Sequence, residues 1–365
     1  MENEGRLARQ SGQTYGSDGT GPAAQPKFRM SGGIIDFAAC NRNASGHTLT
    51  GIVIDHFNFC RWGYNTVTKL DGKGRVESQV RFLETEVGDG SNSERTAGIN
   101  IKTTEVTASG IYDGSGAELT LSPSTTNRCT VGMVNPDGGS RSDLVLAWEG
   151  KVVRYEVTSP ESTGDPTRID RVAVCQSRSH YRVDSPKGDT PWSENPEAGY
   201  RFDSASYLAQ YGVKGAIFDR TVPWFSYDRS DQAVTEVAGH IFVALHAPTL
   251  TYPRKFDKDI PGNIWNGEWK PLHRNFPKFD AASEDVTKKN KAAKDRACAG
   301  LTHDPGEQCD EFPFASTKEG AGKGDGNFSV RYVRQTDNST AGARLSTWYG
   351  KDRILDGDAY GVLVQ

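Results

Sequence analysis

Alternation of apolar and polar residues is the feature that most constrains how this chain can fold. It recurs between residues 28 and 183 in short segments that Asp-Gly or Gly-Ser turns separate. Successive side chains of a strand point to opposite faces of a sheet, so a period of two predicts half-buried strands. The expected strands cover residues 47–57, 74–87, 97–112, 117–122, 143–159 and 168–183.

These strands predict an antiparallel β-sandwich or barrel over residues 28–183. Forty glycines and 17 prolines among 365 residues exclude an all-α fold. Residues 281–300 nevertheless have a helical pattern, with Ser283 as a possible N-cap and Gly300 at the end. We therefore expect an α+β protein with an N-terminal β domain.

The length of the chain favours two domains. Residues 1–27 are polar and without periodicity, which predicts a disordered segment. Residues 184–199 are rich in Pro, Gly and charge and predict a linker, so the second domain is expected to cover 200–365. Within it, 240–248 is a candidate buried strand that Pro248 closes.

Six cysteines occur without the C-x-x-C spacing of a zinc site. Sequence alone allows fifteen pairings of six cysteines. Pairing nearest neighbours keeps each loop inside one domain and gives Cys40–Cys60, Cys129–Cys175 and Cys298–Cys309. Such a framework predicts a secreted protein, although a cytosolic protein with six buried thiols is the alternative. The N-terminus has no apolar signal-peptide region, so we expect the signal to be absent from this chain.

The formal net charge of -4 excludes a polycation that binds nucleic acid by bulk attraction. Residues 251–300 are locally basic, however, with eleven Lys and Arg against seven Asp and Glu. No apolar run approaches the roughly 20 residues of a membrane-spanning helix. His47, His56 and His180 are isolated in the β-rich region, and we expect no site there.

Oxygen-bearing side chains gather near the C-terminus. Asp310 and Glu311 are adjacent, Glu319 follows beside glycines, and Asp337 and Asn338 stand between an alternating strand (329–334) and an expected helix. Hard cations such as Mg²⁺ prefer carboxylate and amide oxygens. Residue types alone favour an ordinary loop and a helix cap.

The motif around the acidic pair adds a resemblance. CDEFPFASTKEG (309–320) resembles the C-[DR]-D-E-[YFW]-P-[FM]-A-x₃-[EQ]-G signature of NucA/NucB-type secreted bacterial deoxyribonucleases. VRYV (330–333), the Asp337-Asn338-x-x-x-Gly342 pattern and DGDAYGV (356–362) are similar to later family motifs and occur in the same order. The resemblance covers roughly residues 255–365.

The resemblance implies a non-specific endonuclease with a ββα-metal core that binds one divalent cation, Mg²⁺ or Mn²⁺. Of Asp310 and Glu311, one would act as the general base, and the other would bind or orient the metal. The other implied positions are Glu319 and Asn338 at the metal and Arg296 and Arg331 at phosphates. His273 is a candidate base outside the motif, with His303 behind it.

We therefore expect a secreted, metal-dependent endonuclease whose substrate is DNA, with RNA as a second substrate class. The oligomeric state stays open. One alternative is a non-catalytic extracellular binding protein that retains a nuclease-like domain. The other is a nuclease toxin delivered to competitors, for which an immunity or inhibitor protein would be the partner.

Overall fold

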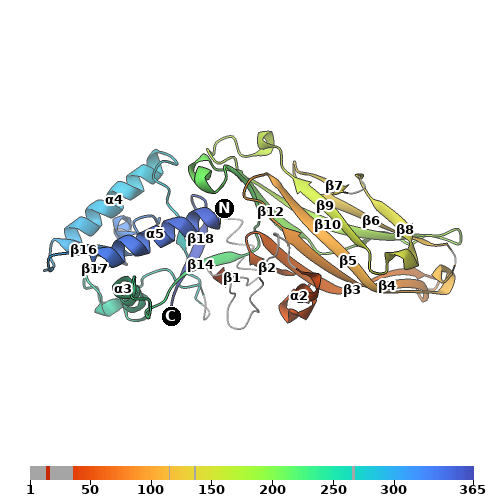
Figure 1. Cartoon of the computed structure of the whole chain (residues 1–365), viewed down its shortest axis with the longest axis horizontal. Helices are drawn as coiled ribbons and strands as arrows, with labels where there is room; N and C mark the ends of the chain where they lie inside the picture. The colour runs from red at the N-terminus through yellow and green to blue at the C-terminus, as the bar shows by residue number, and fades with distance from the viewer. Residues whose placement is uncertain (1–13, 17–35, 115, 135–136, 265–267) are drawn as a thin grey trace. The chain divides into compact units, whose positions relative to one another are not determined.

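The computed structural model describes residues 14–16, 36–114, 116–134, 137–264 and 268–365. The segment 1–27, expected to be disordered, lies outside these residues except for strand β1 (Thr14–Gly16). The chain divides into two compact units. The described part of the N-terminal unit is residues 36–221, and the C-terminal unit comprises residues 222–365 together with β1 (Figure 1).

The N-terminal unit is built from antiparallel strands. In the described part of this unit they form two six-stranded sheets, one ordered β2-β3-β4-β5-β9-β7 and the other β13-β12-β10-β6-β8 with β11 paired to β10. A short helix, α2 (Phe37–Arg42), precedes them. The strands are β2 (Ile52–Asp55), β3 (Asn58–Leu70), β4 (Val76–Asp89), β5 (Thr96–Ser109), β6 (Glu118–Thr125), β7 (Thr130–Val134), β8 (Arg141–Leu144), β9 (Val152–Thr158), β10 (Ala173–Asp184), β11 (Ser193–Glu194), β12 (Ala198–Ser204) and β13 (Lys214–Phe218).

Both sheets contribute side chains to one hydrophobic core. Phe82 and Tyr155 come from the first sheet, Tyr181 and Phe202 from the second, and all four are buried in the same cluster. Two open sheets that share a core have the architecture of a β-sandwich. The predominance of antiparallel strands agrees with the β-rich domain expected from the alternating pattern.

The two units divide later in the chain than the sequence suggested. The expected linker, 184–199, contains β11, which pairs with β10, and the start of β12. Strands β12 and β13 then extend the same sheet, and the division falls after Thr221. Pro, Gly and charge mark exposed turns as well as linkers, so composition could not separate a turn inside a sheet from a connection between domains.

Among its described residues, the C-terminal unit combines two sheets with three α-helices. One sheet has the order β1-β14-β18-β15 and the other is the antiparallel pair β16-β17. Its core gathers Phe225, Ile241, Phe312, Leu345 and Val362. Besides β1, the elements are β14 (Val222–Tyr227), α3 (Thr235–His246), β15 (Leu272–His273), α4 (Ala281–Cys298), β16 (Glu307–Phe312), β17 (Ser329–Arg334), α5 (Gln335–Lys351) and β18 (Ala359–Val364).

The prediction of a strand at 240–248 was wrong, because these residues belong mainly to helix α3. Val237, Ala238, Ile241 and Ala244 are the buried apolar residues of this helix, and their spacing places them on one helical face. The segment 235–246 is also longer than a typical strand. A short apolar run does not distinguish a buried strand from a buried helix by periodicity alone.

Two expected helix caps also differ from the structure. The N-cap of α4 is Asp280, whose Oδ1 accepts a hydrogen bond from the backbone N–H of Ser283 at 2.7 Å, so Ser283 lies inside the helix. Helix α5 begins at Gln335, which places Asp337 and Asn338 in its first turn rather than at a cap. Asp337 instead accepts from the backbone N–H of Glu236 at 3.2 Å and joins α5 to α3.

All three expected disulfides are present: Cys40–Cys60, Cys129–Cys175 and Cys298–Cys309. The first two lie in the N-terminal unit, and the third fastens the end of α4 to β16. Among the described residues, no helix is both long and apolar enough to cross a membrane.

Candidate active site

A hairpin followed directly by a helix holds the acidic pair. Strands β16 and β17 are antiparallel, with Asp310 opposite Arg331 and Glu311 opposite Val330. Helix α5 begins at the residue after β17 ends. Asp310 and Glu311 thus lie on a strand, not on the loop expected from the sequence, and the short connection keeps α5 close to the hairpin.

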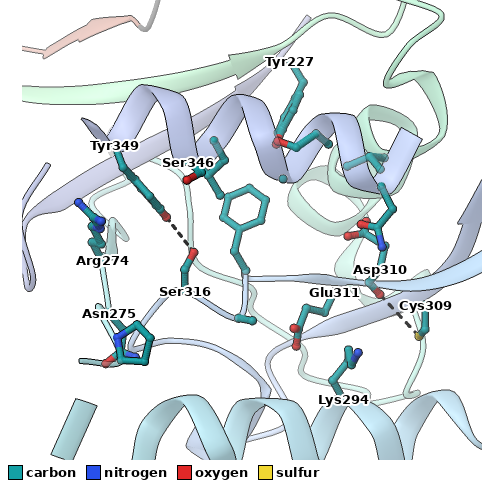
Figure 2. A pocket seen from close by; sticks show the side chains of 18 of the residues that line it. Tyr227, Arg274, Asn275, Lys294, Cys309, Asp310, Glu311, Ser316, Ser346 and Tyr349 are labelled. Atoms are coloured by element: carbon teal, nitrogen blue, oxygen red, sulfur yellow. Dashed lines mark hydrogen bonds between the residues drawn. The ribbon is translucent and has the colours of Figure 1, made fainter. Parts of the chain in front are cut away.

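A pocket of about 470 Å³ opens beside this strand. Asp310, Glu311 and Asn338 all line it, so the structure brings together three of the residues that the sequence selected. Arg274 and Lys294 also line the pocket, and Figure 2 shows them on separate parts of its wall. The pocket therefore combines oxygen donors with two basic side chains.

Asp310 is buried and has a partner that the sequence did not reveal. Its Oδ2 accepts a hydrogen bond from Nδ1 of His240 at 2.7 Å, and Nε2 of the same imidazole lies 2.7 Å from Oγ of Ser329. His240 is on α3, the segment that was mispredicted as a strand. If the segment is interpreted as a helix, the helical spacing places His240 on the same buried face as Val237 and Ile241. That spacing is the sequence feature that could have identified His240.

Glu311 occupies the other face of β16, because adjacent strand residues alternate. Figure 2 shows its side chain on the side toward Lys294 of α4. Burial raises the pKa of the Glu311 carboxyl to about 8, and Asp310 adds to the rise while Lys294 opposes it. Oε2 of Glu311 is buried and, within the described structure, has no hydrogen-bond partner. A buried carboxylate oxygen without a partner is costly unless a cation or a donor reaches it.

Asn338 faces the pocket from the first turn of α5. Its Nδ2 donates to Oε1 of Gln308 at 3.3 Å. Because the amide nitrogen is the atom engaged there, the amide oxygen stays available as an acceptor. Asn338 is therefore placed to supply an oxygen donor on the same pocket as Glu311.

His273 and Glu319 form a separate pair. Nδ1 of His273 lies 2.7 Å from Oε1 of Glu319, and the backbone N–H of His273 donates to Oε2 at 2.8 Å. Neither residue lines the pocket of Asp310. The structure thus pairs Glu319 with His273, and neither side chain belongs to the pocket that Glu311 lines.

The remaining sequence-selected residues lie on the surface. Arg296 and Arg331 are exposed and are not among the pocket-lining residues. His303 is exposed and stacks on Tyr332, with ring centroids 4.4 Å apart. Cys309, which forms a disulfide with Cys298, lines the pocket.

The basic side chains in the pocket were not singled out from the sequence. Arg274 is buried, donates to the backbone oxygen of Ile354 and lies with Cζ 4.6 Å from the centroid of the Tyr349 ring. Lys294 is half-buried on α4, one helical turn before Cys298. Both lie in segments that are similar to family motifs, KPLHRNFP (270–277) and KDRACAG (294–300). Neither residue had a role assigned from the sequence, because the direction of a basic side chain is known only when its element has been placed.

Comparison with known proteins supports one family. No curated protein matches the chain. The family model described as Deoxyribonuclease NucA/NucB matches residues 269–363, which contain the acidic pair, the hairpin and helix α5. The C-terminal segment of this protein is therefore similar to the NucA/NucB deoxyribonucleases, as its motifs predicted.

Proposed function

We propose that this protein is a secreted, metal-dependent endonuclease that hydrolyses DNA phosphodiester bonds without sequence specificity. The observation that carries the proposal is that Asp310, Glu311 and Asn338 line one pocket within the segment that matches a deoxyribonuclease family. The β16-β17-α5 order supports a ββα-metal type of core. Three disulfides support secretion.

Glu311 and Asn338 are the residues proposed to hold the divalent cation. The unpartnered Oε2 of Glu311 fits this role, because a cation would compensate a buried carboxylate whose pKa burial has raised. The described residues contain no cluster of three or more His, Cys, Asp or Glu suited to a metal. The donor set is therefore sparse, which suits Mg²⁺ or Mn²⁺ with water and substrate phosphate completing the shell.

Asp310 is proposed to take a proton from the attacking water. It reaches the same pocket as Glu311 from the opposite face of β16. Arg274 and Lys294 would bind phosphate oxygens of the strand being cut. A bound cation supplies charge neutralisation at the phosphate when the leaving oxygen departs.

Recognition through phosphates gives little sequence discrimination and makes affinity fall with salt. RNA carries the same phosphates, so it is the second substrate class to test. Supercoiled plasmid is the preferred first substrate, because a single internal cut converts it to a form that migrates differently. We expect the full chain to nick it with Mg²⁺ or Mn²⁺ and to stop when EDTA is added.

The decisive variant is Asp310→Asn. It removes the proposed proton acceptor, and we expect cleavage to fall by about 10²–10⁴-fold, the usual contribution of a general base. Asp304→Asn is the matched control, because Asp304 is exposed and precedes β16. Circular dichroism should show both variants folded. A wild-type chain that fails to cut DNA, or an Asp310→Asn variant with normal turnover, would contradict the proposal.

A further inference from the structure

We propose that His240 is a positioning residue that holds the Asp310 carboxylate in its working orientation, with Ser329 fixing His240 in turn. This inference rests on the proposed nuclease function and adds a residue, His240, that the matched segment does not include. His240 precedes residue 269, where the family match begins. Part of the machinery is therefore contributed by helix α3.

The three side chains form one continuous chain of hydrogen bonds. His240 bridges both strands of the hairpin, since Asp310 lies on β16 and Ser329 lies on β17. All three are buried, with exposed fractions of 7% for Asp310, 2% for His240 and 1% for Ser329. Each ring nitrogen has one partner at 2.7 Å, so the imidazole is fully satisfied.

The surroundings explain why a histidine at this place fixes the carboxylate. Val237, one turn before His240, and Ala244, one turn after it, are buried in the apolar core of the unit. Helix α3 is anchored at its start, because Asp337 accepts from the backbone N–H of Glu236. An imidazole held on an anchored helix in a packed core has few rotamers open to it. The Nδ1–H group therefore holds Oδ2 of Asp310, a residue that also lines the pocket.

The connectivity is that of a Ser-His-Asp triad, but its direction is reversed. In a hydrolase triad the serine oxygen meets the substrate and the carboxylate lies behind the imidazole. Here Ser329 is the most buried member, and Asp310 is the member that lines the pocket. Ser329 therefore cannot attack a substrate, and the chain of hydrogen bonds supports Asp310 from behind.

The test compares two amide replacements in the full-length protein. In His240→Asn the amide nitrogen occupies nearly the place of Nδ1 and keeps the donor to Asp310. In His240→Gln the amide reaches the place of Nε2 and Ser329 but withdraws the donor from Asp310. We expect Gln to lower kcat on plasmid DNA by about 10–100-fold with KM nearly unchanged, and Asn to recover most of kcat.

His246→Asn is the matched control on the same helix, because His246 is exposed and its Nδ1 lies 2.9 Å from the carbonyl oxygen of Phe242 in the same helix. Thermal unfolding of each variant separates lost positioning from lost folding. Ser329→Ala gives a second measurement, with an expected two- to fivefold fall in kcat at constant KM.

The outcomes are distinguishable. An active wild type in which Asn and Gln at position 240 behave alike would overturn the positioning role and leave the nuclease proposal intact. An unchanged kcat in Ser329→Ala would overturn the part assigned to Ser329. A wild type without DNA cleavage would refute the proposed function, and the positioning role with it.

Discussion

Two buried glutamates, one in each unit, differ in whether their carboxylate oxygens have hydrogen-bond partners. Glu311 in the C-terminal unit and Glu84 in the N-terminal unit both have a pKa raised first by burial. Glu84 receives hydrogen bonds from Nδ2 of Asn195 at 2.9 and 2.8 Å, one on each oxygen. Glu311 instead leaves Oε2 without a partner among the described residues, beside a pocket.

The two carboxylates differ in the groups that contact them. The neighbours of Glu84 come from its own unit. Glu86 raises the pKa of Glu84 further, whereas the hydrogen bond from Asn195 lowers it. Glu86 is itself paired with Arg61 at 2.7 Å. The charge of Glu86 is therefore paired within the unit. No corresponding partner contacts Oε2 of Glu311 among the described residues. Burial and a raised pKa are therefore not sufficient to indicate a site. Glu311 differs from Glu84 in having, on the pocket of about 470 Å³, an oxygen without a hydrogen-bond partner among the described residues.

The largest expected effect distinguishes the two glutamates by activity. Glu311→Gln should lower DNA cleavage by about 10³-fold, because an amide is a weak substitute for a carboxylate at a cation. Glu84→Gln should leave cleavage per folded molecule within about twofold. Plasmid nicking under saturating Mg²⁺ measures both. Equal losses in the two variants would remove the distinction between a satisfied and an open carboxylate.

Disulfides provide a second comparison between the units. In the chain-entropy estimate, removing Cys129–Cys175, with its separation of 46, costs about 4 kcal/mol of stability, and removing Cys298–Cys309, with 11, costs about 3 kcal/mol. Only the second should reduce cleavage at 37 °C, because Lys294 is one helical turn from Cys298. Paired Cys→Ala variants, compared by thermal unfolding and nicking, test this. Undiminished cleavage after loss of Cys298–Cys309 would count against a role for that bond.

The smallest expected effect, counted per pH unit, is a pH dependence of stability in both units. A carboxyl whose folded pKa exceeds its unfolded value binds more protons when folded, so stability is greatest below the unfolded pKa and falls as pH rises. For Glu311 the fall runs from about pH 4.5 to about pH 8 in metal-free protein. For Glu84 the fall in stability starts at the same pH. Each carboxyl contributes at most about 1.4 kcal/mol of stability per pH unit.

Hydrogen exchange in the full chain, read separately from peptides of the two units, measures this slope. We expect Glu84→Gln to flatten it in the N-terminal unit and Glu311→Gln in the C-terminal unit. Added Mn²⁺ should stabilise only the C-terminal unit, since Glu84 already has its partners. A Mn²⁺ effect of the same size in both units would break the comparison.

Contiguous features were predictable from the sequence. The acidic pair, strand 329–334 and the helix near 281–300 each depend on neighbouring residues, and the structure contains them at or within a few residues of the expected places. The disulfide pairs were also predictable, because each links neighbours along the chain. Local periodicity and short loops carry this information directly.

Residues from distant segments were not predictable. His240 lies 70 positions before Asp310, and Arg274 and Lys294 reach the pocket from a segment and a helix outside the motif. Conversely, Glu319 stands within the motif, yet its carboxylate pairs with His273. Sequence spacing does not give the direction of a side chain once the elements have packed.

The sequence by itself determined that an acidic pair on a deoxyribonuclease-like segment is present and that a disulfide-linked β-rich unit precedes it. Only the tertiary structure decided which partner each carboxylate has: His240 for Asp310, His273 for Glu319, and an open pocket for Glu311. The physical reason is that a carboxylate's chemistry depends on burial and on donors within about 3 Å, and packing of distant segments sets both.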